Sequence, residues 1–200
     1  DEYLSGNVRE KLKLAEALVE TQPEFKVNVE ALKKVIPKDL TATEIGIKLG
    51  ATWIPTDVID DFIYELLDTP NQAQWKIKTK FCSFNSEWYI ANKNYDYTNV
   101  KVYKAYGTGR INAYEIIEKT LNLKDVKIFD TETDINGNKV RVFNAKETAI
   151  AQAKQDQIKQ AFEDWIFNDP ERRERLVKLY NDKFNSIRPR EYDGSHLTFA

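Results

Sequence analysis

Cysteine and histidine are almost absent from this chain of 200 residues, which has one of each, Cys82 and His196. A single cysteine excludes a disulfide framework and a cysteine-rich zinc site, and a single histidine excludes a histidine-based metal centre. No apolar run approaches the roughly 18 residues of a membrane span, and no charged-then-apolar leader opens the sequence. We therefore expect a soluble cytoplasmic protein without a membrane partner. Since the sequence opens on Asp1 rather than methionine, we also expect a piece of a larger protein.

The net charge of the whole chain is close to zero, but charged residues are unevenly distributed along it. The whole chain carries −2, with an isoelectric point near 5.7, which argues against a wholly basic nucleic-acid module. Residues 1–70 carry −6, residues 71–110 carry +5 and residues 111–200 carry −1. The hydrophobic fraction of 42% is ample for a packed core, so the chain as a whole is not disordered. The near-neutral total is thus the sum of an acidic N-terminal segment and a basic, aromatic central segment.

Hydrophobic periodicity predicts an α+β fold: a helical N-terminal part compatible with a winged helix, a central β-hairpin, a helix-plus-hairpin unit and two C-terminal helices. The expected domains are 1–70, 71–145 and 146–200, packed as one or two compact bodies. We expect Ser5 to cap the first helix, Asn28 the second, and a Thr41–Glu44 capping box the third. The predicted helices cover residues 8–19, 29–36, 44–50, 55–67, 111–121, 145–167 and 170–185, and the predicted strands cover 75–81, 88–90, 100–103, 126–129 and 139–143.

The two C-terminal helices carry large apolar side chains at helical spacing. These include Phe162, Trp165, Leu176 and Tyr180, and the spacing predicts that both helices share one core.

Residues 28–67 followed by a hairpin over 74–91 have the order of elements of a winged helix. Residues 44–51 fit the first helix and turn of a helix-turn-helix motif, with glycines at positions 46 and 50 for close packing. The helix that would enter the major groove is acidic, and its carboxylates would repel phosphates. We therefore do not expect docking on DNA through that helix, whose acidic residues are Asp57, Asp60, Asp61 and Glu65.

No arrangement of residues assembles a catalytic site. The loop 107–110 (Gly-Thr-Gly-Arg) lies between a predicted strand and a helix, but it lacks the Gly-Lys-Ser/Thr of a Walker loop and the third glycine of a dinucleotide fingerprint. The carboxylates of Asp60 and Asp61, and those of Asp130, Glu132 and Asp134, are best interpreted as solvated side chains. We expect no catalytic residue, no metal site and no cofactor.

Residues 74–110 combine lysines with aromatic side chains, as nucleic-acid-binding surfaces do. Tyr95, Tyr97 and Tyr106 could also stack on bases. The alternative is that Trp75, Phe81, Trp88 and Tyr103 form strand core while the lysines protect a sheet edge. The candidate nucleic-acid-binding residues are Lys76, Lys78, Lys80, Trp88, Lys93, Lys101, Lys104 and Arg110.

The second half of the chain also resembles a known family. Residues 106–114, 121–123, 144–148, 162–166, 172–176 and 180–199, which include Arg-Pro-Arg-Glu-Tyr-Asp-Gly-Ser-His at 188–196, are similar to the large fused DNA methylase–helicases of bacterial mobile elements and phages. In those proteins this region lies just before the Swi/Snf-type helicase motor. None of the matching positions is a catalytic motif, so the resemblance carries over no catalytic residue.

The resemblance implies a non-catalytic segment that contacts DNA or couples the methylase and helicase regions of one polypeptide. The alternative is a structural module that packs on the helicase lobe without binding nucleic acid.

Overall fold

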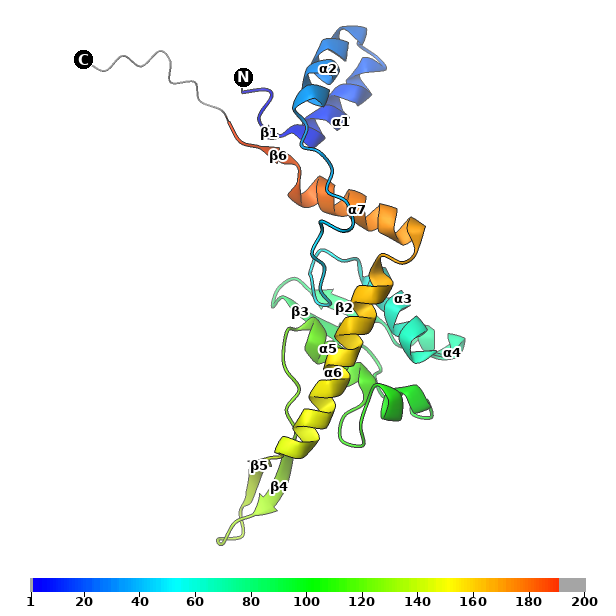
Figure 1. Ribbon diagram of the computed structural model, residues 1–200, viewed down its shortest axis with the longest axis vertical. Helices are drawn as coiled ribbons and strands as arrows, with labels where there is room; N and C mark the ends of the chain where they lie inside the picture. The colour runs from blue at the N-terminus through cyan, green and yellow to red at the C-terminus, as the bar shows by residue number, and fades with distance from the viewer. Residues whose placement is uncertain (1, 191–200) are drawn as a thin grey trace, which may run out of the picture. The chain divides into compact units, whose positions relative to one another are not determined.

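The computed structural model describes residues 2–190, in which helices alternate with short antiparallel hairpins (Figure 1). The predicted α+β class is confirmed. His196 and residues 191–199 of the family-like segment lie outside the described residues. Within the described part, no helix combines the length and apolar character needed to cross a membrane.

The chain divides into two compact units that do not coincide with the predicted segments 1–70, 71–145 and 146–200. The terminal unit combines the residues up to Gly46 with those from Glu171 onward, and the central unit is Ile47–Pro170. The predicted boundary near 70 falls between helix α3 (Thr56–Leu67) and strand β2 (Thr79–Cys82), which pack on each other. The predicted boundary near 145 falls at the start of helix α6 (Ala145–Ile166), which packs on α3 and on helix α5 (Ala113–Leu121), and both boundaries lie within the central unit.

The terminal unit begins with a helical hairpin, α1 (Val8–Val19) and α2 (Lys26–Val35), joined through a 3₁₀ turn at Pro23–Phe25. Its small core is Val8, Ala15, Val29 and Leu32. The predicted caps are wrong. The Asn7 side chain accepts from the Glu10 N–H and caps α1, whereas the Ser5 hydroxyl donates to the Glu2 carbonyl. Asn28 lies inside α2, because the turn at Pro23 starts the helix earlier.

Helix α7 (Pro170–Phe184) and a two-residue ladder, β1 (Gly6–Asn7) with β6 (Ile187–Arg188), complete the terminal unit. The Asn181 side chain is 1% exposed; it donates to the Leu40 carbonyl and accepts from the Leu40 N–H. Arg9 donates to the carbonyls of Pro37 and Asn185. The bonds between Asn181 and Leu40 and between Arg9 and Asn185 join chain segments more than 140 residues apart.

The predicted third helix does not form. The Glu44 carboxylate accepts from the Thr41 N–H and hydroxyl, so half of the capping box is present, but only a single turn follows. Two glycines in this segment lower its helix propensity. Gly50 has φ +104°, and a Cβ there would lie 2.6 Å from the Leu121 carbonyl oxygen. Because 44–51 is turn and loop, the helix-turn-helix interpretation is wrong.

The central unit packs α3 (Thr56–Leu67), α5 (Ala113–Leu121) and α6 (Ala145–Ile166) around one apolar core. The Phe62 ring of α3 meets Phe162 edge-on at a centroid distance of 5.1 Å and Trp165 at 5.3 Å. The aromatic side chains of α6 that were expected to pack on the last helix therefore have a partner in α3.

Two antiparallel hairpins extend this unit, β2 (Thr79–Cys82) with β3 (Glu87–Ile90), and β4 (Phe129–Thr133) with β5 (Lys139–Phe143). Gly137, at φ +81°, forms the second turn, as its Asn-Gly pair predicts. The first predicted strand is too long, because Asn71–Gln74 forms a short helix, α4, and the ladder starts only at Thr79. The predicted strand at 100–103 is wrong: Lys101–Ala105 is a π-helical turn.

Candidate nucleic-acid interface

The structure pairs four of the candidate cations with carboxylates: Lys78 Nζ lies 3.7 Å from Asp60, and the other three cations lie closer to their partners. Lys93 Nζ lies 2.6 Å from Glu118, Lys101 Nζ lies 2.5 Å from Asp68, and Arg110 lies 2.6 Å from Asp130. A paired cation attracts phosphate less strongly, because its charge is already partly neutralised. These three residues therefore contribute less to a basic surface than the sequence suggests. The remaining cations, Lys76, Lys80 and Lys104, are exposed and have no ion pair or side-chain hydrogen bond among the described residues.

Trp88 is core rather than a stacking platform. Its side chain is 2% exposed, and its ring packs against Phe81 at a centroid distance of 4.8 Å. Both main-chain groups of Trp88 bond to the Asn122 side chain, which fixes β3 against the end of α5. The prediction that Trp88 stacks on a base is wrong, and the alternative is right for this residue. Of the tyrosines proposed for stacking, Tyr95 and Tyr97 are exposed and Tyr106 is half-buried.

Asp60 is buried at 7% exposure, contrary to the prediction of a solvated carboxylate. Its Oδ1 accepts from the Thr79 N–H at 2.7 Å, and Lys78 Nζ lies 3.7 Å from its Oδ2. The same ammonium lies 5.1 Å from the centre of the Tyr64 ring. The Tyr64 hydroxyl beside Lys78 raises the pKa of the lysine, and burial raises the pKa of Tyr64. Lys78 is thus held as a cation where α3 meets β2.

Trp75 was expected to lie in a strand, but it follows α4 and is 83% exposed. With Asn71, Gln74 and Lys78 it lines a cavity of about 330 Å³. No sequence signal distinguishes this exposed tryptophan from a core one, because alternation with the lysines places it in the same register as the buried Ile77.

Beside this cavity the β2–β3 hairpin presents Lys80 directly opposite Tyr89, which is 42% exposed. Both side chains point away from the core, since their neighbours Thr79 and Trp88 are buried. The exposed lysines therefore alternate with buried residues from position 76 to position 80. We name this surface the basic hairpin face; it consists of Trp75, Lys76, Lys78, Lys80 and Tyr89.

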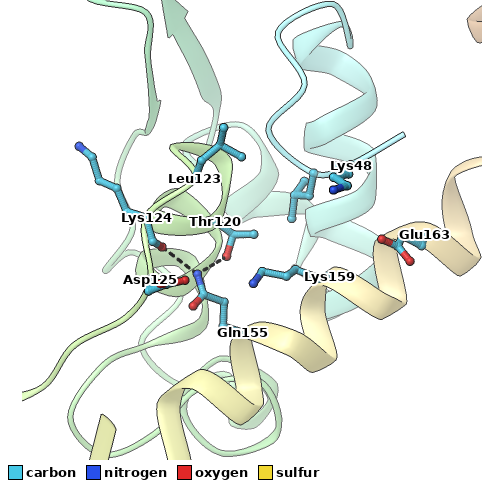
Figure 2. A pocket seen from close by; sticks show the side chains of 9 residues that line it. Lys48, Thr120, Leu123, Lys124, Asp125, Gln155, Lys159 and Glu163 are labelled. Carbon is cyan, nitrogen blue, oxygen red and sulfur yellow. Dashed lines mark hydrogen bonds between the residues drawn. The ribbon is translucent and has the colours of Figure 1, made fainter. Parts of the chain in front are cut away.

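The central unit has a second cavity, of about 340 Å³, beside the end of α5 (Figure 2). The Gln155 side chain, 2% exposed, donates to Thr120 Oγ1 and the Lys124 carbonyl and accepts from the Val126 N–H, so its polar atoms are fully used. The Lys124 ammonium points away from the cavity in Figure 2 and pairs with Glu87. The wall carries both signs of charge, and its residues are Lys48, Leu49, Thr120, Leu123, Lys124, Asp125, Gln155, Lys159 and Glu163.

Tyr114 is a buried polar residue that the sequence analysis missed. Its hydroxyl donates to Asp96 at 3.1 Å and lies 3.0 Å from the Thr69 hydroxyl, and burial raises its pKa. Asn99 donates to the same carboxylate and to the Leu67 carbonyl. This network fixes the 96–99 turn to the end of α3. Among the described residues, no three His, Cys, Asp or Glu side chains come together in a way that could hold a metal ion.

A profile of the family described as a domain of unknown function, DUF8437, matches residues 48–186. No curated protein and no solved structure matches the chain.

Proposed function

The chain belongs to the DUF8437 family, and we propose that it is a non-catalytic domain that contacts DNA through the basic hairpin face. The observation that carries the proposal is the grouping of Lys76, Lys78 and Lys80 with the exposed rings of Trp75 and Tyr89. Cations that neutralise phosphates supply most of the affinity of sequence-independent DNA binding. Exposed aromatic rings beside such cations are typical of nucleic-acid surfaces.

The ion pairs of the central unit restrict where this contact can lie. Lys93, Lys101 and Arg110 already face carboxylates, whereas Lys76 and Lys80 face solvent. The acidic helix α3 repels phosphate at its exposed positions, so the hairpin rather than this helix makes the contact. We expect binding to be weak, independent of sequence and sensitive to salt.

The resemblance to DNA methylase–helicases extends the proposal to the parent protein. In that setting the chain would position DNA between the methylase and helicase regions of the same polypeptide, and it would do so in the bacterial cytoplasm. The chemistry would belong to those regions, and this chain would use neither a cofactor nor a metal ion.

Reversing two charges tests the proposal. Lys76→Glu combined with Lys80→Glu should weaken binding of a fluorescent DNA duplex at least tenfold at low salt, measured by fluorescence anisotropy. It should also reduce the slope of log affinity against log salt by about 2. Lys78 is left intact, because it contacts Tyr64 and Asp60 and its loss would also perturb the fold.

The matched control is Lys127→Glu with Lys146→Glu, which makes the same change of net charge at two exposed lysines outside the basic hairpin face. If the control variant loses as much affinity as the test variant, binding depends on the net charge of the protein and not on the basic hairpin face. If the unaltered protein binds no DNA at low salt, the proposal fails. The lysines then protect the edge of the β2–β3 hairpin, in a module that packs on other protein regions.

A further inference from the structure

We infer that the basic hairpin face binds single-stranded DNA in preference to duplex, with one unpaired base stacked on Trp75 in the cavity beside it. This inference rests on the proposed function and adds the form of DNA and the residue that selects it.

Trp75 presents its ring to solvent from a fixed backbone. The side chain is 83% exposed, although tryptophan is usually among the most buried residues on average. Its main chain caps α4, with its N–H donated to the Ala73 carbonyl. The Tyr64 hydroxyl shares its proton between two carbonyl oxygens of this segment, that of Gln74 at 3.0 Å and that of Ile77 at 2.5 Å. The backbone that carries the indole is therefore held in place before any ligand arrives.

The cavity beside Trp75 offers the other groups that an unpaired nucleotide needs. Its volume of about 330 Å³ falls within the usual range for small-molecule pockets, roughly 300–1,000 Å³. Gln74 Nε2 donates to the Thr69 carbonyl, while Gln74 Oε1 and the Asn71 amide have no hydrogen-bond partner among the described residues. These amide groups can donate to and accept from the edge of a base. Lys78, half-exposed at the same cavity, supplies a cation for a phosphate.

The geometry favours a single strand because an indole ring stacks only on a base whose face is free. In a duplex both faces of a base are covered by its neighbours, and only the base edges are open in the grooves. In a single strand a base can turn out onto an aromatic ring, which strengthens binding by about 5- to 150-fold per base. Tyr89, opposite Lys80, places a second ring and a second cation on the same face for another nucleotide.

The experiment compares two DNA probes and three variants, with an oligouridine as a third probe. Fluorescence anisotropy would be measured with an oligothymidine of about 12 nucleotides and with a duplex of equal length. The unaltered protein should bind the oligothymidine more tightly than the duplex. Trp75→Ala should weaken binding of the oligothymidine by about 5- to 150-fold and leave binding of the duplex nearly unchanged. Trp75→Phe retains a smaller ring, so its affinity for the oligothymidine should lie between those of the unaltered protein and Trp75→Ala.

The control variant is Phe84→Ala, which removes an aromatic side chain that is 98% exposed in the turn of the same hairpin but does not line the cavity. It should leave both affinities unchanged. Circular dichroism of each variant would establish that the fold is intact, which the exposure of both side chains leads us to expect.

The outcomes separate this inference from the proposed function. If the duplex binds as tightly as the oligothymidine, or if Trp75→Ala has no more effect than Phe84→Ala, the preference for single strands is refuted. The proposed function stands in that case, provided that the Lys76 and Lys80 reversals still weaken binding of the duplex at least tenfold. If an oligouridine of the same length binds more tightly than the oligothymidine, the assignment to DNA is refuted. If the unaltered protein binds neither probe, both proposals fail.

Discussion

Phe162 is the side chain whose truncation should reveal the core of the central unit most directly. It is fully buried, and its ring meets the Phe62 ring edge-on at 5.1 Å. Phe→Ala at a buried site costs about 3–5 kcal/mol through lost transfer energy and the cavity left behind. Because an edge-to-face pair adds roughly 0.5–1.5 kcal/mol beyond burial, we expect the upper half of that range for Phe162→Ala.

Urea unfolding followed by tryptophan fluorescence measures this loss in the intact chain. All four tryptophans (Trp53, Trp75, Trp88 and Trp165) lie in the central unit, so their emission reports that unit and not the terminal one. With a slope of about 2 kcal/mol per molar urea, a loss of about 4 kcal/mol lowers the midpoint by about 2 M.

The control on the same helix is Ile150→Ala, at a side chain that is 42% exposed. Its cost should stay within about 0.5 kcal/mol. Equal midpoints for Phe162→Ala and the unaltered chain would refute the packing of α6 on α3. A midpoint lowered equally by both variants would show that the helix itself, and not the Phe162 contact, was weakened.

Two further predictions concern carboxylates. Asp60→Ala should destabilise the central unit by about 1–3 kcal/mol in the same urea assay, because it leaves the buried Thr79 N–H without its acceptor. An unchanged midpoint would show that water replaces the carboxylate. The Arg110 guanidinium holds the pKa of the Asp130 carboxyl below its usual range, so the stabilisation from this pair is present at neutral pH and is lost as the pH falls through that lowered value. Arg110→Ala should therefore raise the pKa of Asp130 toward the ordinary range of an aspartate, as measured by NMR titration of the carboxyl carbon, and an unmoved titration would contradict the pairing.

Most of the helices could be predicted because each one carries its own signal. In α3 and α5 the apolar side chains recur every three or four residues, and this stripe requires no knowledge of the partner that covers it. The turn between β4 and β5 was equally predictable, since an Asn-Gly pair favours the positive φ that Gly137 adopts.

The failures occur where a distant contact decides the local structure. Gly50 lies against the backbone at the end of α5, so the 44–51 segment forms a loop. The strand predicted at 100–103 fails through a local contact instead: a Cβ on Gly107 would lie 2.1 Å from the Val102 carbonyl oxygen, and an extended strand could not bring these two residues so close.

The candidate site was predictable in its charge but not in its geometry. The excess of lysine between residues 71 and 110 is visible in the sequence, whereas its pairing with carboxylates of α3, α5 and β4 is not. For the same reason the sequence does not show that Trp88 is buried whereas Trp75 is exposed. Trp88 is buried by Phe81, its neighbour across the ladder, and Trp75 is exposed because α4 ends just before it.

The terminal unit is assembled from two segments that are far apart in the sequence. This arrangement constrains the order in which the chain can fold during synthesis. Helices α1 and α2 are synthesised before the central unit, but the buried Asn181 that bonds to Leu40 is made only after the whole of Ile47–Pro170. Closing a loop of that length costs roughly 4 kcal/mol of chain entropy if the intervening residues are unfolded. The central unit can fold within its own span, and once folded it shortens the flexible path that α7 must close. Although α1 and α2 are made before the central unit, they are therefore expected to complete their native contacts after it.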